Sequence, residues 1–185
     1  GWSMGGMLSW ALTQRPEAAR LARIATVDIV PRLLNDAHWR FGLRDGRDAG
    51  VFARTTARMR EDWPAFTRVF VPRVLAAGDD PLRRRLRPWL IGLSEGNDGR
   101  SMARLWSSMV AQDLRDQLPR ITLPCLVACG ARSQLYPAEA STWVEGRIAD
   151  ARLVRFDHSG HAPHLEEPER FRATMTAFAR ETHDR

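Results

Sequence analysis

The chain has 185 residues, of which 44% are hydrophobic and 27% are charged, a composition typical of soluble globular proteins. All 28 basic residues are arginines, and with 22 acidic residues they give a formal net charge of +6. No apolar run approaches the roughly 20 residues of a membrane span, and the arginines alternate with acidic residues, so neither a membrane partner nor a nucleic-acid partner is expected.

The first six residues, GWSMGG, contain the pattern G-x-S-x-G directly before an apolar stretch. This pattern is typical of a nucleophile elbow, which holds a reactive serine on a strained turn between a strand and a helix. Ser3 is therefore the candidate nucleophile, and a helix is predicted from Ser3 to Gln14, before Pro16. The strand that would precede the elbow is not in the sequence. We expect the chain to be the C-terminal portion of a larger enzyme and to be inactive alone.

Three apolar runs predict buried strands, at residues 21–28, 124–130 and 151–156. Helices are predicted at residues 137–149 and from about Glu167, and alternating strands and helices indicate a parallel sheet. The two cysteines, Cys125 and Cys129, lie in one of these strands, where they are too far apart to form a disulfide with each other. With no disulfide framework and no His/Cys cluster, we expect a cytoplasmic protein without a metal or a cofactor.

The stretch between the first and second strands breaks this rhythm, because it has helical periodicity and no convincing strand. We predict three units: a partial core at residues 1–30, a helical lid insertion at 31–118, and a C-terminal core at 119–185. The insertion is rich in aromatic residues, which either line an apolar substrate pocket or pack the lid helices together. The candidates for lining such a pocket are Trp2, Trp39, Trp106 and Tyr136.

A serine hydroxyl is a weak nucleophile, so Ser3 needs a histidine as its base. The loop after Phe156 leaves the carboxyl end of a predicted parallel strand, which is where sites form in such sheets. It contains three of the five histidines, namely His158, His161 and His164. Gly160 permits a tight turn and the following Ala-Pro pair stiffens the exit, so His161 is the preferred base.

Three segments, GWSMGG at 1–6, PCLVACG at 124–130 and SGHAPHLEEP at 159–168, resemble the α/β-hydrolase superfamily. The resemblance is nearest to small carboxylesterases of the pimeloyl methyl ester type and to their lactonase and C–C hydrolase relatives. It implies the C-terminal part of a doubly wound α/β-hydrolase parallel sheet with a helical lid. It also implies Ser3 as the nucleophile, His161 as the base, and the Met4 N–H as one donor of the oxyanion hole.

The acidic member of the expected triad departs from the usual family pattern. Most members have an aspartate after the strand that corresponds to 124–130, where this chain has Ser133. Some members, notably those similar to haloalkane dehalogenases, carry the acid at the end of the preceding strand, and that position is Asp28 here. We expect Asp28 to be the triad acid. Asp157 is the rival, and a Ser–His dyad without an acid is a third alternative.

The expected function is hydrolysis of a small or medium, largely apolar ester or lactone through an acyl-enzyme. C–C bond hydrolysis and acyl transfer are alternatives on the same scaffold. A non-catalytic binding protein is a further alternative, suggested by Ser133 at the usual acid position. The sequence leaves the oligomeric state open.

Overall fold

A computed structural model describes residues 1–44, 46 and 49–181. Its sheet has three parallel strands in the order β1 (Ile24–Val27), β2 (Cys125–Gly130) and β3 (Ala151–Phe156). In register, Ile24 lies beside Cys125, and Cys125 lies beside Ala151. Because the strands are parallel, their carboxyl ends meet at one edge, as in other doubly wound sheets. The predicted parallel sheet is confirmed.

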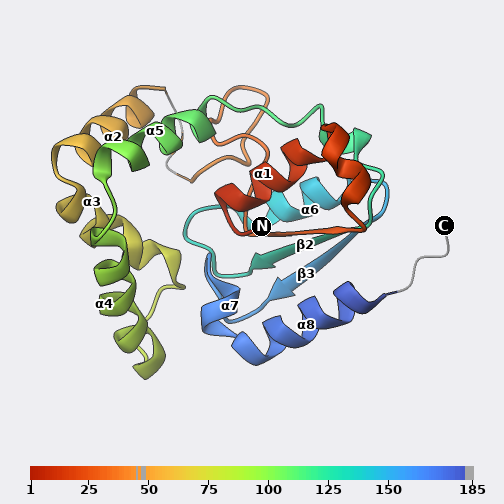
Figure 1. Ribbon diagram of the computed structural model, residues 1–185. Helices are drawn as coiled ribbons and strands as arrows, with labels where there is room; N and C mark the ends of the chain where they lie inside the picture. The colour runs from red at the N-terminus through yellow and green to blue at the C-terminus, as the bar shows by residue number, and fades with distance from the viewer. Residues whose placement is uncertain (45, 47–48, 182–185) are drawn as a thin grey trace.

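Helices cover both faces of this sheet (Figure 1). On one face lie α1 (Met4–Leu12) and α6 (Ala138–Glu145), and on the other lies α8 (Pro168–Arg180). Trp10 of α1 and Val144 of α6 pack with Val127 in the main core. The next residue of β2, Ala128, packs toward Phe171 of α8. Alternate residues of β2 thus serve opposite layers, as strand geometry requires.

The first two residues lie alongside β1 in the parallel direction. Trp2 forms an isolated bridge with Val27, the Ser3 N–H donates to the Val27 carbonyl at 3.0 Å, and the Val27 N–H donates to the Gly1 carbonyl at 2.8 Å. These bonds fix the start of α1 at the carboxyl end of β1. After α1, the 3₁₀ helix Pro16–Arg20 leads into β1.

Four helices form a group beside the carboxyl edge of the sheet, and we call them the lid (Figure 1). They are α2 (Ala49–Glu61), α3 (Trp63–Phe70), α4 (Pro81–Glu95) and α5 (Gly99–Val110). An aspartate caps the N-terminus of three of them by accepting a backbone N–H, which explains where each begins. These caps are Asp62, Asp80 and Asp98.

The two ends of the predicted insertion lie outside the four lid helices. Leu33 and Leu114 are buried in the main core, together with Leu118 of the 3₁₀ helix Leu118–Arg120. The four lid helices lie within residues 49–110, and Phe52 of α2 also belongs to the main core. The boundaries of the three predicted units stay predictions. In the described part of the chain, no helix is long and apolar enough to cross a membrane, and both cysteines are unpaired and buried.

Candidate active site

Ser3 occupies a strained turn at the start of α1. Its backbone has φ 52° and ψ −123°, a region that residues other than glycine rarely adopt. A Cβ on Gly1 would lie 2.2 Å from the Gly5 carbonyl oxygen, and one on Gly6 would lie 2.6 Å from Cγ2 of Ile29. The tight positions are therefore the first and the sixth, whereas a Cβ on Gly5 would meet nothing within 4 Å. The turn has the geometry of the predicted nucleophile elbow.

The Met4 N–H is left open at the N-terminus of α1. The N–H groups of Ser3, Gly5 and Gly6 all donate to backbone carbonyls. Among the residues that the structure describes, no acceptor pairs with the Met4 N–H. The first N–H groups of a helix have no partner inside the helix, and the helix dipole favours negative charge beside them. This donor is available to an oxyanion.

His161 and Asp28 form a buried pair at the carboxyl edge of the sheet. Nδ1 of His161 lies 2.8 Å from Oδ2 of Asp28, and the two side chains are 4% and 3% exposed. The backbone of His161 is held as well: its N–H donates to the Val74 carbonyl at 2.9 Å, and its carbonyl accepts the Trp2 indole N–H at 2.6 Å. The imidazole is thus fixed by contacts on both its ring and its peptide group.

Asp28 follows β1 with φ 46°, another strained conformation. Its Oδ2 also accepts the Ser133 hydroxyl at 2.7 Å, and its Oδ1 accepts the Gly130 N–H at 3.2 Å. Ser133, which occupies the usual acid position, therefore supports the carboxylate supplied by the neighbouring strand. From the sequence, Ser133 was interpreted only as the absence of the usual acid. The sequence signal for the contact between Ser133 and Asp28 is that the two residues follow adjacent parallel strands.

The other candidates in the histidine loop point elsewhere. Asp157 is exposed and pairs with Arg170 at 3.1 Å. His158 is exposed. The His164 ring packs edge-on against Trp2, and burial, followed by the charge of His161, lowers its pKa. The structure therefore brings Asp28, and not Asp157, to His161.

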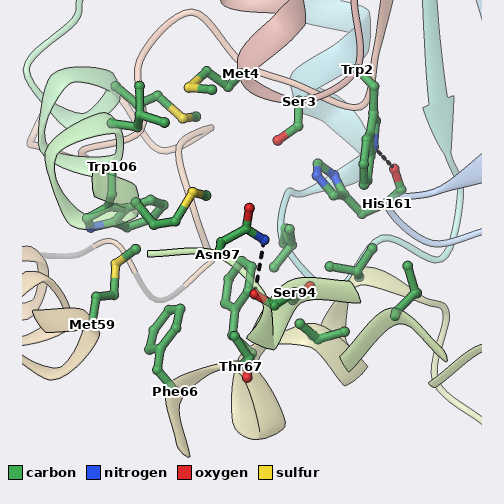
Figure 2. Close-up of a pocket in the computed structure, with 18 of the residues that line it drawn as sticks. Trp2, Ser3, Met4, Met59, Phe66, Thr67, Ser94, Asn97, Trp106 and His161 are labelled. Carbon is green, nitrogen blue, oxygen red and sulfur yellow. Dashed lines mark hydrogen bonds between the residues drawn. The ribbon is translucent and has the colours of Figure 1, made fainter. Parts of the chain in front are cut away.

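An apolar cavity of about 380 Å³ lies between the core and the lid, within the size range of small-molecule sites. Figure 2 shows Ser3 and His161 at one end and Phe66 and Met59 toward the other. The described contacts include no hydrogen bond between Ser3 Oγ and His161, and such catalytic bonds often tighten only when substrate binds. Three predicted pocket residues line this cavity: Trp2, Trp106 and Tyr136.

The prediction for Trp39 is wrong. Trp39 is buried in the main core, edge-on to Phe41 and Trp143, and its indole N–H donates to the Arg32 carbonyl at 3.0 Å. It is not among the residues that line the cavity. The physical reason is that residues 33–41 pack on the core instead of joining the lid.

Asn97, in the turn between α4 and α5, brings a polar group into this apolar cavity. Its amide nitrogen donates to the Ser94 carbonyl at 3.0 Å, which orients the amide. In Figure 2 its oxygen points into the cavity. Asn97 was not predicted as a pocket residue, because in the sequence only the aromatic residues of the insertion indicated a pocket. Across the described residues, no group of three or more His, Cys, Asp or Glu side chains could hold a metal.

A parallel sheet with a serine on a strained elbow and a buried Asp–His pair at its carboxyl edge is the arrangement of an α/β hydrolase. Residues 1–174 match the model of the alpha/beta hydrolase family. The chain belongs to this family.

Two similar proteins are named as esterases. The chain is 30% identical over 182 residues to the pimeloyl-[acyl-carrier protein] methyl ester esterase of Nitrosomonas europaea, covering 96% of the chain and 69% of that protein. It is 34% identical over 177 residues to the protein of the same name from Aromatoleum aromaticum, covering 91% and 68%. The chain thus spans about two thirds of the length of these relatives.

Solved structures agree on the fold. An esterase from Exiguobacterium antarcticum has a TM-score of 0.86 at 22% identity, covering 98% of the chain and 65% of the neighbour. The enol-lactonase of Burkholderia xenovorans LB400 has a TM-score of 0.82 at 24% identity, covering 98% and 64%.

Proposed function

We propose that the protein is a serine hydrolase that cleaves carboxylic esters with an apolar acyl group through an acyl-enzyme. The observation that carries this proposal is the buried Asp28–His161 pair at the same end of the apolar cavity as Ser3. The names of the relatives support ester substrates and make acyl methyl esters the first compounds to try.

In the proposed mechanism, Ser3 Oγ attacks the ester carbonyl while Nε2 of His161 accepts the hydroxyl proton. Nδ1–H of His161 donates to Asp28, which stabilises the imidazolium that forms. The tetrahedral oxyanion accepts the Met4 N–H. His161 then protonates the leaving alkoxide, which departs as an alcohol. Water, activated by the same histidine, releases the carboxylic acid and restores Ser3.

The cavity supports an acyl chain of medium length as the recognised group. Its walls are largely apolar and come from both the elbow and the lid, so a hydrocarbon chain would lose water contact there. The Asn97 oxygen offers one hydrogen-bond acceptor in these surroundings. Asn97 is exposed to solvent, so a donor group along or beyond the chain would replace water at this acceptor.

The test uses the complete natural protein with a fluorophosphonate probe, p-nitrophenyl hexanoate and methyl heptanoate. We expect a covalent adduct on Ser3, located by peptide mass spectrometry, and release of the free acid from both esters. A non-catalytic binding protein would give neither result. An adduct on a different residue, or no adduct, would contradict the proposal, and transfer of the acyl group to an added alcohol in preference to water would favour an acyltransferase.

The length of the accepted acyl chain provides a prediction about the cavity. Phe66 of α3 stacks between Trp63 and Phe70 and lines the cavity away from Ser3. Phe66→Ala is expected to raise the ratio of kcat/KM for p-nitrophenyl dodecanoate over p-nitrophenyl butyrate by about tenfold. Removing the ring opens space at the lid end of the cavity, and each methylene of the longer chain that enters this space is removed from water.

The matched control for this prediction is Trp89→Ala. Trp89 is an exposed aromatic residue of α4 and does not line the cavity. We expect it to leave the ratio unchanged. The same ratio in both variants would show that the lid end of the cavity does not hold the acyl chain.

A further inference from the structure

A buried ion pair joins lid helix α4 to the histidine loop. Nη2 of Arg83 lies 2.9 Å from Oε1 of Glu166, and the two side chains are 11% and 1% exposed. Arg83 belongs to the first turns of α4, whereas Glu166 ends the short helix α7 (Pro163–Glu166) after His161. A buried pair of this kind is weak evidence for stability, since desolvation opposes the attraction. The position of this pair, between the lid and the histidine loop, suggests a role other than stability.

The Glu166 carboxylate also accepts two backbone N–H groups. Oε1 accepts from Ala76, which follows the 3₁₀ helix Val71–Val74, at 2.9 Å. Oε2 accepts from Gly160, the residue before His161, at 2.6 Å. One carboxylate thus joins the lid helix, the segment that follows α3, and the histidine loop.

The backbones around this carboxylate are in close contact. A Cβ on Gly160 would lie 2.4 Å from the Ala76 nitrogen, and a Cβ on Gly130 would lie 1.7 Å from the Gly160 oxygen. The end of β2, the histidine loop and the segment after α3 therefore stack without room for side chains between them. Glu166 supplies the acceptor that the buried N–H groups of Ala76 and Gly160 need.

We propose that Arg83 and Glu166 are a positioning pair that holds the Ser159–Gly160 peptide, directly before His161, in place, so that Nδ1 of His161 stays aligned with Asp28. Glu166 fixes the peptide on one side, and Arg83 fixes Glu166 while donating to the His158 carbonyl at 2.8 Å. Neither residue touches the proposed substrate cavity. The expected change in kcat on replacing either residue rests on the proposed function, whereas the expected change in the alignment of the His161 side chain does not.

Titratable and charged groups from several elements surround His161 and the Arg83–Glu166 pair. His161 is faced by Asp28 from the end of β1, by His164 from α7, and by Tyr136 from the loop before α6. Arg83 also pairs with Asp80, the cap of its own helix. Burial raises the pKa of Glu166, while Arg83 and the two backbone N–H groups oppose that rise.

The experiment compares four variants of the complete natural protein: Glu166→Gln, Arg83→Gln, the double variant, and Arg83→Lys. The readouts are kcat and KM for p-nitrophenyl hexanoate, the melting temperature, and the ¹H NMR chemical shift of Nδ1–H of His161. Glu95→Gln is the matched control, because Glu95 also lies on α4 and pairs with Arg68 at 2.8 Å.

We expect Glu166→Gln to lower kcat about 10- to 100-fold with KM within about twofold, because it acts on the base and not on substrate binding. The Nδ1–H resonance of His161 should move upfield or broaden as its hydrogen bond to Asp28 loosens. The double variant should lose little more than Glu166→Gln, as expected for residues acting as one unit. Arg83→Lys should recover most of the kcat lost in Arg83→Gln, and Glu95→Gln should change none of these values.

A lower melting temperature with unchanged kcat and an unchanged Nδ1–H resonance of His161 would overturn the proposal and leave the pair a purely structural one. If the unsubstituted protein hydrolyses no ester, the proposed function fails, and the Nδ1–H resonance of His161 still decides the positioning role. If Glu166→Gln does not fold, Arg83→Gln decides by the same readouts, because it keeps both backbone acceptor contacts of Glu166.

Discussion

Ser3→Ala is expected to lower kcat by about 10⁶-fold, because the nucleophile and the base of such a site act as a unit and losing one removes most of the catalysis. KM should change little, since the cavity walls are untouched. The elbow should also survive, because alanine meets the same backbone strain at φ 52° that serine already bears. The measurement is the hydrolysis of p-nitrophenyl hexanoate by the purified complete protein, with the melting temperature recorded alongside.

Ser9→Ala is the matched control for this loss. Ser9 lies on the same helix, and its hydroxyl donates to the Gly5 carbonyl at 2.9 Å. Its replacement should leave kcat within about twofold, since such a bond contributes only about 1 kcal/mol to stability. Residual turnover in Ser3→Ala comparable to that in Ser9→Ala would mean that another group is the nucleophile.

Asp28→Asn is expected to lower kcat by about 10⁴-fold at neutral pH, with a small change in KM. The asparagine oxygen can take the place of Oδ1 and accept the Gly130 N–H, and the amide nitrogen in the place of Oδ2 can donate to the Ser133 hydroxyl oxygen, so the strand end should keep its shape. The loss is chemical: the imidazolium has no carboxylate beside it, and the amide favours the wrong tautomer of His161.

Asp157→Asn separates the two candidate acids. Asp157 is exposed and paired with Arg170, an interaction of small energetic value at a surface. We expect its kcat to stay within about twofold of the unsubstituted protein. Full activity in Asp28→Asn would support a Ser–His dyad, and a comparable loss in Asp157→Asn would remove the distinction between the two carboxylates.

Local sequence patterns predicted the parts of the fold whose signals are short-range. The apolar runs located all three strands, and the G-x-S-x-G pattern located the strained turn at Ser3. His161 followed from the rule that loops at the carboxyl ends of parallel strands form sites. Asp28 came from the family resemblance, and its hydrogen bond to His161 agrees with the expected pairing.

Features that depend on the pairing of distant segments were not predictable. The contact between Ser133 and Asp28 depends on the register that puts Val27 beside Ala128. Trp39 looked like the other aromatic residues of the insertion, because composition does not show whether a segment packs on the core or joins the lid. The link from Arg83 to Glu166 likewise joins residues 83 positions apart.

The indole of Trp2 binds the carbonyl of a residue 159 positions later in the chain. Ribosomal synthesis delivers the N-terminal side first, so the elbow emerges long before its histidine has been made. A nascent chain that ends before residue 161 therefore holds Ser3 without its proposed base. Under the proposed mechanism, such an unfinished chain would expose Ser3 without an activated hydroxyl, and the site would gain its chemistry only after His161 has been added.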